Sequence, residues 1–279
     1  MKPKRLVLLL LLFTLTIPLL AGCREPKLES RWKNRDIVID GDDSDWGNYI
    51  EFYDENTRID LSLLNDNSDL YIKLDSRNKM LNRQIMSLGF TVWFDPKISK
   101  DKKFGIHFPL GMRDDMMPMQ DDMMSSPIPR GGEIPGMKEE SELFTKRIEE
   151  MQREVEVIVP GKSERLTMSV AEAESSGISV KMSMPKGNLI YEIKIPLVSS
   201  KTCPYAIGAN FERGIGIGFE TGKIDKRKMD EMIAKRREQM RGRDRNMGSS
   251  GGMMPGGGGM LNPLELWTKV TLASGQTTQ

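Results

Sequence analysis

The chain has 279 residues, of which 29% are charged and 38% are hydrophobic, and its formal net charge is +1. A charge so close to zero gives no electrostatic basis for a nucleic-acid partner. One histidine and two cysteines are too few for a zinc site built on several such ligands, or for a disulfide framework.

Residues 1–22 have the form of an export signal. A basic start is followed by an uninterrupted apolar run from Leu6 to Phe13, by further mostly apolar residues to Leu20, and by the small residues Ala21 and Gly22. A retained membrane-spanning helix is the alternative, because the whole apolar stretch approaches the length that such a helix needs. The interruptions at Thr14, Thr16 and Pro18 favour the signal.

The segment Leu20-Ala21-Gly22-Cys23 resembles the lipobox of bacterial lipoproteins. The resemblance implies cleavage after Gly22 and acylation of Cys23, with two or more acyl chains that hold the protein stably on a membrane. It also implies sorting to the outer membrane of a Gram-negative cell, because Arg24 stands where an aspartate would retain the protein elsewhere. We therefore expect an outer-membrane lipoprotein that faces the periplasm or the cell surface. The signal holds three basic residues and no acid, so the mature chain has a net charge of −2.

The remaining sequence predicts a single domain. Residues 23–35 are expected to form a lipidated tether, and residues 36–272 a β-sandwich. Met-rich insertions interrupt this domain at about 110–137 and 241–262, and residues 273–279 form a polar tail. Two short helices are expected in or beside the insertions, at 138–153 and 225–240, because their apolar residues share one helical face.

Alternating apolar and polar residues predict about ten short strands. The clearest hairpin joins 57–64 and 69–74 through a polar turn. In 189–195, the alternation predicts that Tyr191 and Ile193 point into the core, whereas Glu192 and Lys194 face water. Further strands are expected at 37–39, 88–94, 104–108, 155–159, 166–171, 178–184, 205–211, 215–219 and 264–272. Many short strands with few helices predict an all-β, antiparallel sandwich.

Several segments, taken in order, resemble the family 9 carbohydrate-binding modules and the related DOMON-type sandwiches. They are Ile39-Asp40-Gly41 with Asp45-Trp46, the strands 69–72 and 89–96, Tyr191–Leu197, and the closing strands 215–220 and 267–272. The resemblance implies a β-sandwich and a carbohydrate ligand that stacks on aromatic rings.

Trp93 and Trp267 are the candidate ligand-binding residues. Each lies opposite the apolar positions of its strand, so each is predicted on the outer face of the sandwich. A structural role for both rings is the main interpretation, and an exposed stacking platform is the alternative.

Methionine is unusually frequent, with 21 residues. Thioethers are soft ligands that select Cu(I). Candidate copper ligands are Met116, Met117, Met119, Met123 and Met124. The alternatives are a contact surface for a protein partner and an inert insertion.

The sequence signals for other candidate binding sites are weaker. Asp40, Asp42, Asp43 and Asp45 resemble a calcium-type oxygen cluster without the ordered spacing of an EF-hand, and solvated turn residues are the alternative. Cys203 is expected to be a buried small apolar residue, and a reactive or intermolecular thiol is the alternative. No other cofactor is expected.

Catalysis is not expected from this sequence. His107 lies in an alternating segment that predicts the polar face of a strand, and no nucleophile motif accompanies it. The sequence favours a non-catalytic, lipid-anchored binding module with carbohydrate as the first candidate ligand. A Met-rich copper-binding envelope lipoprotein and an envelope protein–protein interaction module are the alternatives.

Overall fold

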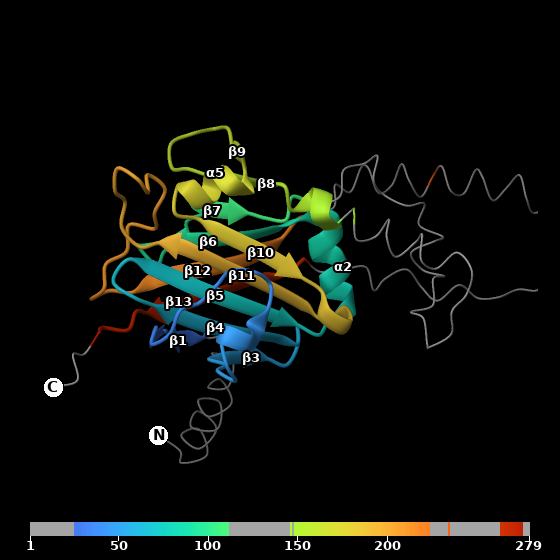
Figure 1. Ribbon diagram of the computed structural model, residues 1–279, viewed down its shortest axis with the longest axis horizontal. Coiled ribbons are helices and arrows are strands. Elements are labelled where there is room, and N and C mark those ends of the chain that lie inside the picture. Colours follow the sequence, from blue (N-terminus) through green and yellow to red (C-terminus); the bar gives the residue numbers. More distant parts are fainter. Residues whose placement is uncertain (1–24, 112–145, 147, 224–233, 235–262, 276–279) are drawn as a thin grey trace, which may run out of the picture.

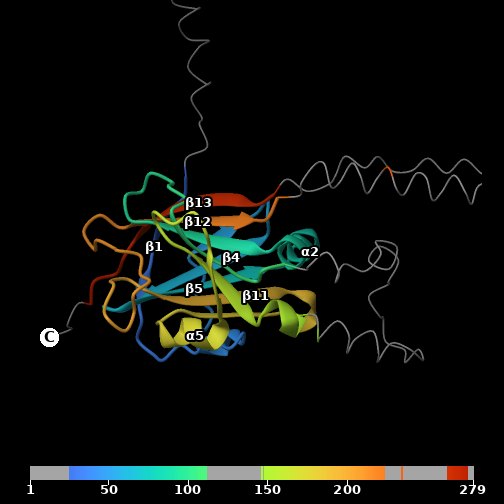
Figure 2. The ribbon, with the colours of Figure 1, turned by 90° about the horizontal axis from the view of Figure 1, so that it is seen from above.

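The computed structural model describes residues 25–111, 146, 148–223, 234 and 263–275. Cys23, the candidate methionine ligands and most of both predicted helices lie outside these residues. The described residues form two facing sheets with a hydrophobic core between them (Figure 1, Figure 2). The predicted all-β sandwich is therefore confirmed.

Sheet A has seven strands. In spatial order they are β1 (Lys27–Glu29), β13 (Glu265–Thr271), β12 (Ile215–Thr221), β6 (Phe90–Asp95), β7 (Phe104–His107), β8 (Glu154–Ile158) and β9 (Leu166–Ser169). Sheet B has six strands: β10 (Ser179–Ser183), β11 (Leu189–Pro196), β5 (Asp69–Ser76), β4 (Ile59–Asn65) and β2 (Arg31–Trp32), with β3 (Phe52–Asp54) also paired to β4. Pairing is antiparallel except for β1 with β13 and β2 with β4.

Two helices occur between strands of the sandwich in the chain, at positions where the sequence predicted no helix. Helix α2 (Lys79–Leu88) begins at Asn78, whose side chain accepts hydrogen bonds from the N–H groups of Met80 and Leu81, and it buries Ile85 against the core. Helix α5 (Val170–Ser175) begins at a capping box formed by Ser169 and Glu172, which ends the strand predicted over 166–171. Short 3-10 turns lie at η2 (Asp43–Asp45) and η3 (Pro185–Gly187). Segments 37–39 and 205–211 form no strand.

The predicted tether is wrong over its described part. Residues 27–32 are strands of the fold: β1 joins the edge of sheet A, and β2 joins sheet B through β4. Ser30 lies between them, and its hydroxyl donates to Asn65 Oδ1 at 2.5 Å. Asn65 also bonds both backbone groups of Ala273, so the two ends of the domain are fastened together. Paired backbone groups give this segment a fixed path that composition alone does not reveal.

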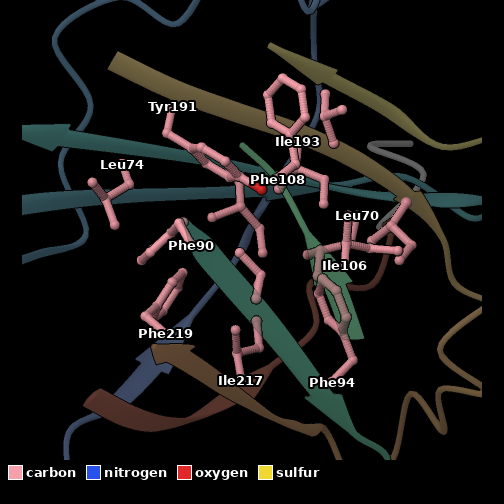
Figure 3. Packing of buried hydrophobic residues seen from close by; sticks show 14 of the residues in the cluster. Leu70, Leu74, Phe90, Phe94, Ile106, Phe108, Tyr191, Ile193, Ile217 and Phe219 are labelled. Atoms are coloured by element: carbon pink, nitrogen blue, oxygen red, sulfur yellow. The ribbon is translucent and has the colours of Figure 1, made fainter. Parts of the chain in front are cut away.

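The core follows the predicted alternation. Tyr191 and Ile193 are fully buried, and the Tyr191 ring meets Phe90 edge-on with 5.1 Å between centroids (Figure 3). Phe94, Ile106 and Phe219 come from sheet A and lie on the same inner face (Figure 3). The hairpin of β4 and β5 contributes Leu61, Ile72 and similar residues, as predicted.

The prediction that Glu192 faces water is wrong, because a loop covers the outer face of sheet B. The Glu192 side chain points outward but has no exposed surface. Its carboxylate accepts hydrogen bonds from the N–H groups of Asp40 and Gly41 and from Trp46 Nε1. Trp46 packs in a second apolar cluster with Tyr71. The outer face of sheet B is therefore closed here by residues 37–46.

Candidate binding surface on sheet A

Tryptophan and glycine alternate along one row across sheet A. Trp267 pairs with Gly218, Gly218 with Trp93, and Trp93 with Gly105. The row points away from the core, because its strand neighbours Val92 and Phe219 point inward. Both predicted ligand-binding tryptophans are thus brought onto one outer surface.

The glycines allow each indole to lie against the neighbouring strand. A Cβ atom on Gly218 would come within 2.8 Å of the Trp267 ring, and one on Gly105 within 2.7 Å of the Trp93 ring. Any larger residue would push these rings off the sheet. The glycines of β12 therefore let the sheet pack closely against the indoles, in the strand predicted at 215–219.

Charged side chains surround the Trp93 indole. Trp93 Nε1 donates to Glu220 at 2.8 Å, and Lys102 Nζ bridges Glu220 at 2.8 Å and Glu265 at 2.9 Å. Lys223 lies 3.4 Å from Glu220. Burial alone would raise the pKa of Glu220, but the hydrogen bonds from Lys102 and Trp93 lower it below its usual value. Glu220 is consequently a carboxylate at neutral pH.

Sequence reasoning missed these charged residues. Glu220 follows Gly218 by two positions, so strand alternation alone places it on the Trp93 face. Lys102 lies in a loop, and no local signal in the sequence places it beside Glu220.

The loop of residues 96–103 folds over part of this face. Asp95 fixes the loop, because its buried carboxylate accepts N–H bonds from Lys97, Ser99 and Asp101. Ile98 Cα would lie 3.5 Å from a Cβ on Gly216, so the loop crosses strand β12. The resulting surface has little exposed indole: Trp93 is 8% and Trp267 is 9% exposed. A ligand that stacks on either ring has to displace the groups above it.

His107 lies beside this surface and is held in place. Its Nδ1 is 2.9 Å from Thr91 Oγ1, and its ring packs against Gly89. Burial lowers the pKa of His107, and nearby Arg165 adds to the effect. The ring is therefore neutral near pH 7, on the outer face of strand β7.

The calcium-type aspartate cluster gains no support from the geometry, whereas the candidate copper ligands lie outside the described residues. The described residues contain no group of three or more His, Cys, Asp or Glu side chains that can hold a metal ion. Asp42 accepts from the Ser44 N–H and Asp45 from the Val38 N–H, so these aspartates cap the covering loop. Cys203 is a free, partly exposed thiol, less buried than predicted.

Comparison with known proteins adds a single structural likeness. No family model matches the chain, and no curated protein sequence matches it. A solved structure of a family 9 carbohydrate-binding module from Caldicellulosiruptor kristjanssonii, in complex with glucose, is similar with a TM-score of 0.34 and 12% sequence identity. The match covers 71% of this chain and 79% of that one. A likeness this distant carries no inference about a ligand.

Proposed function

We propose that this protein is a lipid-anchored, periplasm-facing module that binds its ligand without catalysis, and that the ligand is a carbohydrate. The supporting observation is the Trp93–Glu220–Lys102 arrangement on sheet A. The Trp93 ring is only 8% exposed, so it is not a stacking platform, and the groups that a ligand meets are the Glu220 carboxylate and the Lys102 ammonium, which are partners for hydroxyl groups.

The anchored location is supported by the sequence Leu20-Ala21-Gly22-Cys23. Among the residues that the structure describes, no helix has the length and apolarity to cross a bilayer. Mass spectrometry of the mature protein tests the anchor. We expect an N-terminal Cys23 that carries a diacylglyceryl group and an amide-linked acyl chain, and an unmodified thiol would refute the proposal.

The proposal that the protein is not a catalyst is supported by the protonation state and the burial of its one histidine. His107 is neutral, buried and hydrogen-bonded to Thr91, so it is poorly placed to exchange protons with a ligand. Glu220 is committed to two lysines and an indole.

A glycan array probed with the full mature chain bearing Cys23→Ser tests the ligand class without a membrane. We expect binding to one group of glycans, and at least tenfold weaker binding for Glu220→Gln and for Lys102→Met. Lys201→Met is the matched control. Lys201 is exposed and lies in the connection between β11 and β12, so it is not part of sheet A. If binding is absent, or equal in all variants, the proposal that this surface binds carbohydrate is refuted.

Copper binding by the methionine residues is the second candidate, and one observation on the described residues favours it. Described segments of the chain end at Gly111 and at Lys223, and another begins at Pro263; Gly111 and Gly222 lie against Gly89, and Leu264 is hydrogen-bonded to Thr221. Met-rich stretches that start side by side can supply ligands to one soft ion.

Competition for Cu(I) with a chromophoric chelator tests this. We expect uptake that is lost on deletion of residues 112–124, and unchanged uptake contradicts it. Capture of an envelope protein through the same segment, with no copper uptake, would instead support the interaction-module alternative.

A further inference from the structure

The residues that the structure describes begin at Glu25, two residues after the proposed lipidation site. Pro26 O accepts hydrogen bonds from Thr268 Oγ1 at 2.9 Å and from the Lys269 N–H at 3.2 Å. Two residues span at most ~7 Å, so Glu25 lies within that distance of Cys23. A headgroup layer is about 5–8 Å thick on each side of a bilayer. Given the lipid anchor of the proposed function, Glu25 is thus held at the level of the lipid headgroups.

The loop of residues 96–103 lies beside this point. Lys100 forms an ion pair with Glu25, and the loop packs over strand β12 near the start of β1. Figure 2 shows the teal loop next to the start of the blue β1 segment, on the side of the molecule where β12 and β13 lie. If Cys23 is held in the bilayer, Lys100 is therefore held close to the membrane through its ion pair with Glu25.

Lysine side chains dominate the surface around Glu25. Lys27 lies directly opposite Lys269 in the sheet, and like charges in that position repel each other. Lys97 is exposed and has no ion-pair partner among the described residues. Exposed lysines in this patch are Lys27, Lys97, Lys100 and Lys103, with Lys269 half-buried. The acids near them are Glu25, paired with Lys100, and Asp101, paired with Lys103, together with Glu29 on β1, while Glu265 and Glu220 pair with Lys102 and the buried Asp95 is bonded to its own loop.

We infer that Lys97, Lys100 and Lys103 of the 96–103 loop, together with the β1–β13 edge, form the membrane-contacting face of the anchored protein, with lysines against the phosphates of anionic phospholipids, whereas Lys102 is held on the ligand surface by Glu220 and Glu265. With Lys102 included, six lysines stand against the four carboxylates Glu25, Glu29, Asp101 and Glu265, which leaves an excess of two positive charges, although the mature chain as a whole is negative. Basic residues close to a membrane surface are attracted by anionic headgroups. The anchor then fixes both the height and the orientation of the domain.

The test uses the full lipidated protein, with Cys203→Ser, in vesicles of phosphatidylethanolamine and phosphatidylglycerol. A nitroxide is attached at Lys97→Cys or, as a control, at Lys181→Cys, an exposed position on strand β10 of sheet B. We expect the probe at 97 to be at least threefold less accessible to a water-soluble nickel chelate than the probe at 181. Equal accessibility would overturn the inference. Acylation of Cys23 is verified in the same sample, so failure of the anchor is distinguished from failure of the orientation.

A charge variant tests the lysines themselves. With the probe placed at Ser99→Cys, we expect the combined change of Lys27, Lys100 and Lys103 to Gln to remove most of the shielding in vesicles that contain phosphatidylglycerol. The control changes three exposed lysines elsewhere, Lys162, Lys181 and Lys201, to Gln. Shielding that survives the first change, in a protein with an unaltered melting temperature, would refute the role of the lysines.

Discussion

Trp46 Nε1 donates a 2.6 Å hydrogen bond to Glu192 Oε1, although 146 residues separate the two in the chain. The bond joins the loop of residues 37–46 to the centre of sheet B, where Glu192 has no exposed surface. The same carboxylate accepts two backbone N–H groups of the loop. One buried side chain thus holds a whole covering segment.

Glu192 should make stability depend on pH. Burial raises its pKa to about 7 from the ordinary 4.5, despite the hydrogen bonds from Gly41 and Trp46 that lower it. Because the folded state holds this proton more tightly than the unfolded state, its stabilising contribution is complete below pH 4.5 and is lost as the pH rises through about 7. We expect Glu192→Gln to flatten this fall in the free energy of unfolding, measured with urea between pH 4.5 and 8. Glu174→Gln, at an exposed position, should keep the wild-type slope. A wild-type slope in Glu192→Gln would contradict the assignment.

The glycines of sheet A should be intolerant of a methyl group only where a tryptophan lies above them. Gly218→Ala places Cβ 2.8 Å from the Trp267 ring, and we expect a loss of about 1–3 kcal/mol together with a shift in tryptophan fluorescence. Gly216→Ala on the same strand meets its nearest atom at 3.4 Å and should cost less than about 1 kcal/mol. Equal losses of stability in the two variants would show that strand propensity, and not contact with the indole, explains why glycine is needed at position 218.

Asn65 should be essential to the junction of the two chain ends. Its amide bonds Ser30 Oγ and both backbone groups of Ala273, in a site with no exposed surface. Asn65→Ala leaves those groups without partners, so we expect a loss of about 2–4 kcal/mol in urea unfolding. Asn67→Ala, in the exposed turn that follows, should change stability by less than about 0.5 kcal/mol. A mild effect at Asn65 would mean that β1 and β2 hold without it.

The Tyr191 hydroxyl should be dispensable. It is completely buried, and within the described residues it has no hydrogen-bond partner. Removing an unpaired polar group from an apolar site is favourable, so Tyr191→Phe should be neutral or more stable by about 1–2 kcal/mol. Tyr191→Leu, which also removes the edge-on contact with Phe90, should be less stable. A clear loss in Tyr191→Phe would reveal a partner such as an ordered water.

The sequence alone determined the layers of this protein. Alternation of apolar residues identified most strands of both sheets, although not β1, β2 and β3, and it placed Tyr191, Ile193 and the Leu61 side of β4 in the core. It also put Trp93 and Trp267 on the outer face. These properties are local, because a period of two residues assigns each side chain to one face of its own strand.

Only the tertiary structure decided what lies on top of each sheet. A charged residue on an outer face was expected to meet water, but Glu192 is covered by residues 37–46 and Trp93 is flanked by Lys102 from a loop. Likewise, residues 27–32 have the composition of a tether but pair with strands more than 30 positions away. Such contacts join distant parts of the chain, and the periodicity of a single segment holds no information about its long-range partners.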